Sequence, residues 1–80
     1  MNRERLKTLA ISDTGFIFDP VTGSAFSSNG VGIHIINCLK AGMSTGEIIA
    51  SLLETYDVSQ EDLEPDVTDF IRGLRDNYLI

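Results

Sequence analysis

The 80-residue sequence is poor in the residues that build most covalent and catalytic sites. It contains one cysteine, one histidine and no tryptophan. A single cysteine excludes an internal disulfide framework and suits a reducing compartment. No apolar run resembles a signal peptide or approaches the roughly 20 residues needed to cross a bilayer. The sequence therefore predicts a cytoplasmic protein with no membrane partner.

Basic residues are also scarce. The sequence contains six Lys and Arg residues and twelve Asp and Glu residues, which gives a formal net charge of −6 at pH 7. Only Lys40, Arg72 and Arg75 are basic after residue 7, whereas acidic side chains gather over residues 54–69. Because nucleic-acid affinity comes largely from Lys and Arg that neutralise phosphates, this distribution opposes binding to nucleic acid or to an anionic membrane.

Motifs that carry chemistry are missing as well. No phosphate-binding loop, nucleophile elbow or metal motif occurs. His34 falls on the polar face of a predicted helix, and Cys38 borders the buried face of that helix without a histidine or second cysteine at metal-ligand spacing. The carboxylates of residues 54–69 are interpreted as helix N-terminal complements and solvated surface. We expect no enzymatic activity, no cofactor and no metal.

The composition that remains is that of a folded chain. Hydrophobic residues make up 42% and charged residues 22%, and no repeat, linker or low-complexity segment interrupts them. This length predicts one domain over residues 1–80, which buries about 60% of its unfolded surface and is only modestly stable alone.

The first third of the chain is typical of a small antiparallel sheet. Residues 15–18 and 24–27 form two short strands around the turn Asp19-Pro20-Val21-Thr22-Gly23, in which Asp19 can cap the turn and Gly23 can adopt positive φ. Residues 6–11 make a plausible first strand. The connections are too short for crossovers, so the strands are predicted to be antiparallel. A sheet this small should keep one edge unpaired, and an unpaired edge can bind a peptide.

Two helices are predicted next. The first starts at Ser28 or Asn29, buries an apolar face and closes at Gly42 as a left-handed cap. Ile33 lies off that face and is expected to be exposed. The second starts with a capping box, Ser44 to Glu47.

The last helical segment contains Pro65. Proline disfavours helical geometry in the preceding residue and lacks a donor, so we predict one turn over residues 59–64 and the main helix from Pro65. The apolar stripe of this helix contains Val67, Phe70, Ile71, Leu74 and Tyr78. Phe70 is expected to be central to the core.

Several of these segments together resemble a known family. They are the Gly-containing hairpin, the Asn that enters an apolar helix, the pattern S-T-x-E-I-I-x-x-L from Ser44, Tyr56, and the closing pattern D-V-x-x-F-I-x-x-L from Asp66. Over residues 9–80 the chain is similar to the PqqD-like peptide chaperones, the family of coenzyme PQQ synthesis protein D. The resemblance implies an α+β fold, a small winged helix-turn-helix with a three-stranded antiparallel sheet followed by three helices.

The resemblance also implies a function. Family members bind the leader segment of a ribosomally made precursor peptide and present it to a modifying enzyme, here a radical SAM or a kinase-related protein. The leader adds as a strand beside the third strand, against the last helix. Carried onto this sequence, the strand consists of Ser24, Ala25, Phe26 and Ser27, and the helix wall is drawn from Val67, Ile71, Arg72, Leu74 and Arg75. Arg72 and Arg75 lie three apart and could meet a peptide carboxylate; without the resemblance, both are ordinary surface arginines.

Two other functions stay open. One is a small winged-helix assembly or regulatory subunit that binds a partner protein without a peptide ligand. The other is a DNA-binding winged helix whose last helix enters the major groove. The acidic residues at the start of that helix, Glu61, Asp62 and Glu64 among them, disfavour DNA because they would stand against phosphates.

Overall fold

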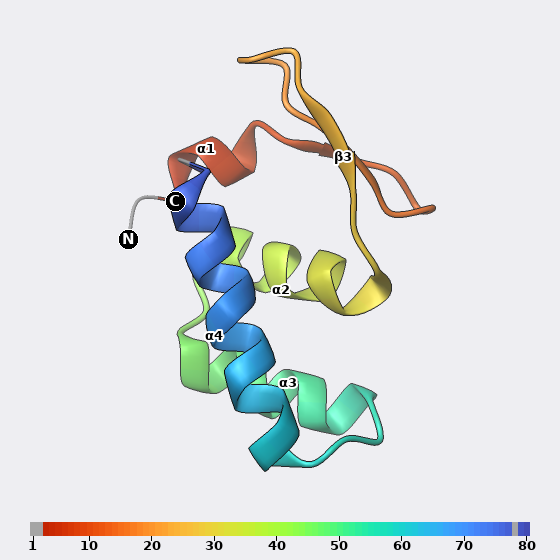
Figure 1. Ribbon diagram of the computed structural model, residues 1–80, viewed down its shortest axis with the longest axis vertical. Coiled ribbons are helices and arrows are strands. Elements are labelled where there is room, and N and C mark those ends of the chain that lie inside the picture. The colour runs from red at the N-terminus through yellow and green to blue at the C-terminus, as the bar shows by residue number, and fades with distance from the viewer. Residues whose placement is uncertain (1–2, 78) are drawn as a thin grey trace.

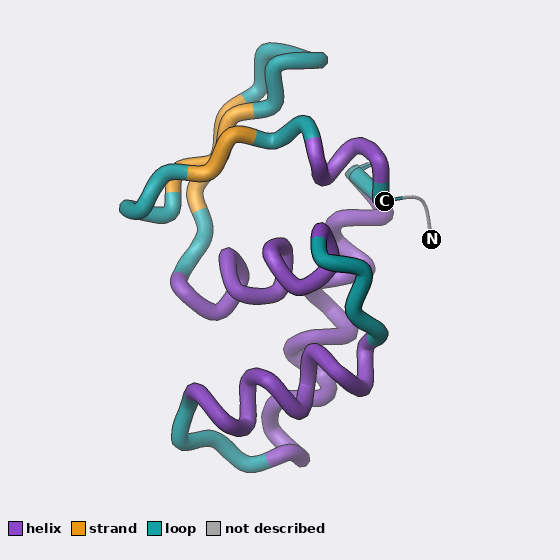
Figure 2. Tube along the Cα trace, turned by 180° about the vertical axis from the view of Figure 1, so that it is seen from behind, coloured by secondary structure: helices purple, strands orange, loops and turns teal. Residues whose placement is uncertain are grey.

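The computed structural model describes residues 3–77 and 79–80. The element order is α1 (Glu4–Lys7), β1 (Ala10–Ile11), β2 (Phe16–Phe18), β3 (Ala25–Ser27), α2 (Gly30–Lys40), α3 (Thr45–Thr55) and α4 (Gln60–Asp76). The small sheet lies at one end of the molecule and α3 at the other, and the long helix α4 joins the two ends (Figure 1). Seen from behind, α2 lies between the sheet and α3 (Figure 2).

The sheet is antiparallel with the order β1-β2-β3, as the short connections predicted. Asp19 closes the β2–β3 turn: its Oδ1 accepts a hydrogen bond from the Val21 amide at 3.0 Å, and its Oδ2 accepts one from the Thr22 hydroxyl at 3.1 Å. Gly23 has φ 76°, a value that glycine adopts without steric cost. The predicted turn chemistry is confirmed.

The prediction of a strand over residues 6–11 is wrong for its first half. Glu4–Lys7 forms the helix α1, and the strand β1 consists of Ala10 and Ile11 alone. Leu6 and Leu9 are both buried. Their spacing of three residues puts both on one side of a helical turn, whereas alternation along a strand would point them to opposite faces. Burial of these two leucines therefore favours the helical turn.

The start signals of α2 and α3 are confirmed. Asn29 caps α2 by accepting a hydrogen bond from the Gly32 amide at 2.9 Å. Ser44 and Glu47 form the reciprocal capping box of α3, and Gly42 between the two helices has φ 84°. Ile33 departs from expectation, since it is half-buried and packs against the core.

The predicted break at Pro65 is also wrong, because α4 runs unbroken from Gln60 to Asp76 with the proline inside it. Ser59 caps the helix through the Asp62 amide. Leu63 and Val67, one on each side of the proline, are both buried. Proline costs one backbone hydrogen bond, and burial on both sides outweighs that loss.

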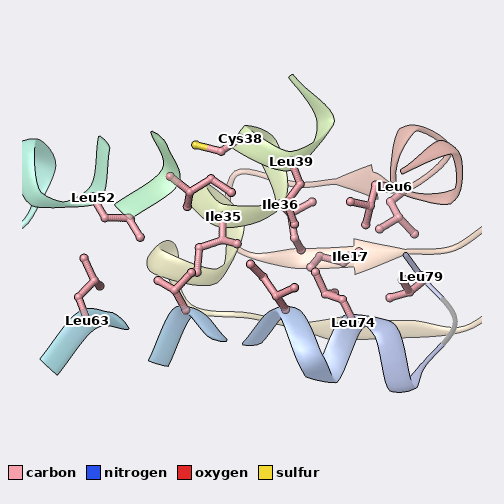
Figure 3. Close-up of a cluster of buried hydrophobic side chains, with 14 residues drawn as sticks. Leu6, Ile17, Ile35, Ile36, Cys38, Leu39, Leu52, Leu63, Leu74 and Leu79 are labelled. Carbon is pink, nitrogen blue, oxygen red and sulfur yellow. The ribbon is translucent and has the colours of Figure 1, made fainter. Parts of the chain in front are cut away.

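The core is a layer of aliphatic side chains between the sheet and the helices. Leu6 of α1, Ile17 of β2, Leu39 of α2 and Leu74 of α4 converge there (Figure 3). Leu52 and Leu63 extend the same layer between α3 and α4. Phe70 was expected at its centre but is only half-buried at its edge. Tyr78, the last residue of the predicted stripe, lies outside the described residues.

Ile17 and Phe16 provide a matched test of the sheet packing, because they are neighbours on β2 that face opposite ways. Ile17 is 0% exposed and Phe16 is 51% exposed. We expect Ile17→Ala to lower the free energy of unfolding by about 2–5 kcal/mol through the lost burial and the cavity left behind. Phe16→Ala should change it by less than about 0.5 kcal/mol. Urea unfolding followed by circular dichroism measures both free energies. An equal loss of stability in the two variants would contradict the observation that Ile17 is buried and Phe16 is exposed.

Candidate functional site

A groove of about 770 Å³ lies between β3 and the second half of α4. Residues Ser24–Ser28 line it on the sheet side. The helix side consists of Phe70, Gly73, Leu74 and Asn77. The remaining lining residues are Arg5, Asp19, Thr22 and Leu79.

The backbone of β3 presents free hydrogen-bonding groups along this groove. Two backbone hydrogen bonds show which residues next to β3 bond to the β2 side. The Ser24 carbonyl accepts one from the Asp19 amide at 2.8 Å, and the Ser28 amide donates one to the Gly15 carbonyl at 2.8 Å. In an antiparallel pair, hydrogen-bonded residues alternate with residues whose N–H and C=O groups point away from the partner strand. Phe26 is therefore bonded to β2, whereas Ala25 and Ser27 direct their amide and carbonyl groups to the open edge.

Two aromatic rings give the groove apolar walls. Phe26 is paired with Ile17, and directly opposite residues project to the same face, so its ring lies on the helix side of the sheet. It is 36% exposed. Across the groove Phe70 lies against the backbone of α2. A Cβ built on Gly32 would come within 1.9 Å of the Ser28 hydroxyl oxygen and within 2.9 Å of the Phe70 ring. Glycine at position 32 thus allows both side chains to approach α2 closely.

An ion pair closes one end of the groove. The guanidinium of Arg5 donates from Nη2 to Oδ2 of Asp19, whose side chain is buried. Burial alone would raise the pKa of Asp19. The Val21 amide, the Thr22 hydroxyl and the Arg5 charge together outweigh burial and hold that pKa below its ordinary value. Nε of Arg5 is buried without a hydrogen-bond partner among the described residues.

The structure divides the predicted site residues between two hollows and the core. Leu74 and the four β3-side residues Ser24, Ala25, Phe26 and Ser27 line the groove. Val67 is fully buried in the core. Ile71, Arg72 and Arg75 instead line a separate depression of about 190 Å³ with Thr45 and Thr68. The sequence places all of them on one apolar-and-basic stretch, and only the packing of α4 against α3 decides which side faces the sheet.

The sequence analysis did not assign eight residues that line the groove: Arg5, Asp19, Thr22, Ser28, Phe70, Gly73, Asn77 and Leu79. Gly73 did have a signal in the sequence. An isolated glycine inside a helical apolar pattern lowers helix stability by about 1 kcal/mol relative to alanine, so it stands out in the sequence of this helix. Arg5 has no such signal in the sequence, because it comes into contact with Asp19 only in the folded chain.

Comparison with known proteins assigns the family. A family model described as Coenzyme PQQ synthesis protein D (PqqD) matches residues 14–80. The chain belongs to the PqqD family. No curated protein sequence matches it.

Two solved structures share the PqqD fold of this chain. The structure of TbiB1 in complex with the TbiA(beta) leader peptide is 29% identical, covers 89% of this chain and 84% of its own, and has a TM-score of 0.78. The lasso peptide synthetase B1 complexed with the leader peptide is 26% identical, covers 86% and 82%, and has a TM-score of 0.74. Each of these neighbours holds a leader peptide.

The described residues of this PqqD member contain no group of His, Cys, Asp or Glu that could hold a metal ion. His34 was expected on the surface but is half-buried, with Nε2 2.9 Å from the Ser51 hydroxyl and its ring edge-on to Tyr56. It therefore joins α2 to α3. Cys38 is buried, as predicted. Among the described helices none is both long and apolar enough to cross a membrane.

Asp19 makes the stability of the groove end pH-dependent. Its folded pKa lies below the ordinary value of 3.8, so the ionised carboxylate stabilises the fold above that value, and this contribution is lost as the pH falls through the folded pKa. We expect Asp19→Asn to be less stable than the parent at neutral pH and to lose less stability on acidification. Urea unfolding at pH 7 and pH 3 measures the difference.

The matched control for this experiment is Asp57→Asn, which changes an exposed carboxylate between α3 and α4. Its free energy of unfolding should equal that of the parent at both pH values. An Asp19→Asn variant with the same acid sensitivity as the parent would show that Asp19 contributes nothing to it. Glu47 adds a second acid-sensitive contribution, because hydrogen bonds from Ser44 lower its pKa.

Proposed function

We propose that the chain is a non-enzymatic recognition element that binds the leader segment of a ribosomally made precursor peptide. The observation that carries this proposal is the open edge of β3 beside an apolar groove, in a fold shared with two solved structures that hold leader peptides. The PqqD family assignment supports it independently.

The proposed mode of binding is strand addition. A guest strand beside β3 would exchange backbone hydrogen bonds with Ala25 and Ser27, whose groups already point outward in the register of the sheet. Such bonds provide affinity without reading sequence, while alternate guest side chains enter pockets and provide specificity. One set of these side chains would enter the groove between Phe26 and Phe70.

The second partner in this proposal is the enzyme that modifies the precursor. The chain supplies the peptide site and no catalytic group, so the chemistry must come from that enzyme. A radical SAM enzyme or a kinase-related protein, and a cytoplasmic location, remain predictions from the sequence. DNA binding is disfavoured because Glu61, Asp62 and Glu64 are all exposed at the start of α4.

Strand addition predicts an alternating pattern of amide protection. When the leader of the precursor encoded beside this chain is titrated into the 15N-labelled protein, the Ala25 and Ser27 amides should become protected from hydrogen exchange. The Phe26 amide should change little, because β2 already engages it. Protection confined to α3, or to Thr68, Arg72 and Arg75, would contradict this site and favour an assembly surface.

Ala25→Pro tests the same geometry by mutation. The Ala25 amide makes no bond to β2, and proline is tolerated on edge strands, so the hairpin should persist. The bound peptide would lose the backbone donor of residue 25 and would clash with the proline ring. Its affinity should therefore fall at least about tenfold, or 1.4 kcal/mol. The control is the double variant Arg72→Glu with Arg75→Glu, which lies outside the groove and should bind the leader like the parent. Fluorescence anisotropy and thermal melting measure both.

A further inference from the structure

We infer that Gly73 determines specificity in the groove, by leaving a seat in the helix wall for one large apolar side chain of the guest peptide. This inference rests on the proposed function. Gly73 lies in the last turn of α4 and also lines the groove.

The fold itself does not require glycine at this position. Gly73 is not among the positive-φ glycines, and a Cβ built on it would meet no atom of the described residues within 4 Å. Gly32 in α2 is the opposite case, because its Cβ would collide with the Phe70 ring. Glycine destabilises a helix interior relative to alanine. At position 73 no contact with the described residues requires that loss, and the glycine leaves open space on the groove surface.

The position of Gly73 indicates what the seat accepts. Phe70 and Asn77 lie three residues before it and four after it, so all three share one helix face. The missing side chain of Gly73 leaves a notch between them. Phe70, Leu74 and Leu79 surround this part of the groove with apolar surface, and Phe26 faces it from β3. A polar guest side chain would lose its hydration there, so the seat fits an aromatic or large aliphatic side chain.

The test fills the notch in steps and compares it with a glycine elsewhere. Gly73→Ala and Gly73→Leu place one and four carbon atoms in the seat. Gly46→Ala and Gly46→Leu are the matched controls, because Gly46 is also helical, also has no atom within 4 Å of its would-be Cβ, and lies in α3 outside the groove. The probe is the fluorescein-labelled leader of the precursor encoded beside this chain.

The expected result separates stability from binding. Gly73→Ala should raise Tm by about 2–6 °C, since alanine favours the helix. Leader affinity should nevertheless fall with the size of the new side chain, by at least about tenfold for Gly73→Leu. Both Gly46 variants should bind like the parent. An alanine scan of the leader should find one large apolar residue whose truncation weakens binding to the parent but causes little further loss in Gly73→Leu.

Two outcomes overturn the inference in distinguishable ways. Parent-like leader affinity in Gly73→Leu would refute the seat while leaving strand addition at β3 in place. Absence of leader binding by the parent protein would refute the proposed function and this inference with it. A fall in affinity that the Gly46 variants share would also refute the seat, because the loss would then follow from helix stabilisation rather than from occupation of the groove.

Discussion

Attachment of the sheet to the helices depends on the burial of one strand residue, Ile17. It is the only buried residue in the three strands, and it lies between α1, α2 and α4 in the core. Every residue of β3 is exposed. The sheet is thus fixed through its middle strand, while its last strand remains uncovered. This arrangement leaves the backbone of β3 available along the groove, which a sheet buried on both edges could not do.

The groove is shaped by two glycines that act in opposite ways. Gly32 is needed inside the protein, because its lack of a Cβ lets Phe70 lie against α2. A Cβ at Gly73 would contact none of the described residues, and Gly73 lies on the groove surface. Phe70 is consequently a wall of the groove rather than the centre of the core. The aliphatic residues Val67 and Leu74 of α4 are buried in the core instead.

The two arginines of α4 illustrate how one helix serves two surfaces. Arg72 and Arg75 lie beside Thr45 of α3, whereas Phe70 and Gly73 face β3. Residues one or two apart on a helix point in different directions, so the neighbours of a groove residue in sequence need not share its surface. The paired charges at the groove belong instead to Arg5 and Asp19. These two residues are far apart in the sequence, with β1 and β2 between them.

The sequence by itself determined the local structure. Turn residues, the Asn29 and Ser44 caps and the helical period of the apolar residues are short-range properties, and they predicted the hairpin, the three helices after it and the unpaired edge. Tertiary structure alone decided the remainder: the helical turn that buries Leu6 and Leu9, the continuity of α4 across Pro65, and the side of α4 that meets the sheet. The physical reason is that each of these outcomes is a competition between a local preference and burial against residues distant in the chain. The local preference can be inferred from neighbouring residues in the sequence. The surface that distant residues bury, which can outweigh that preference, is known only from the packed structure.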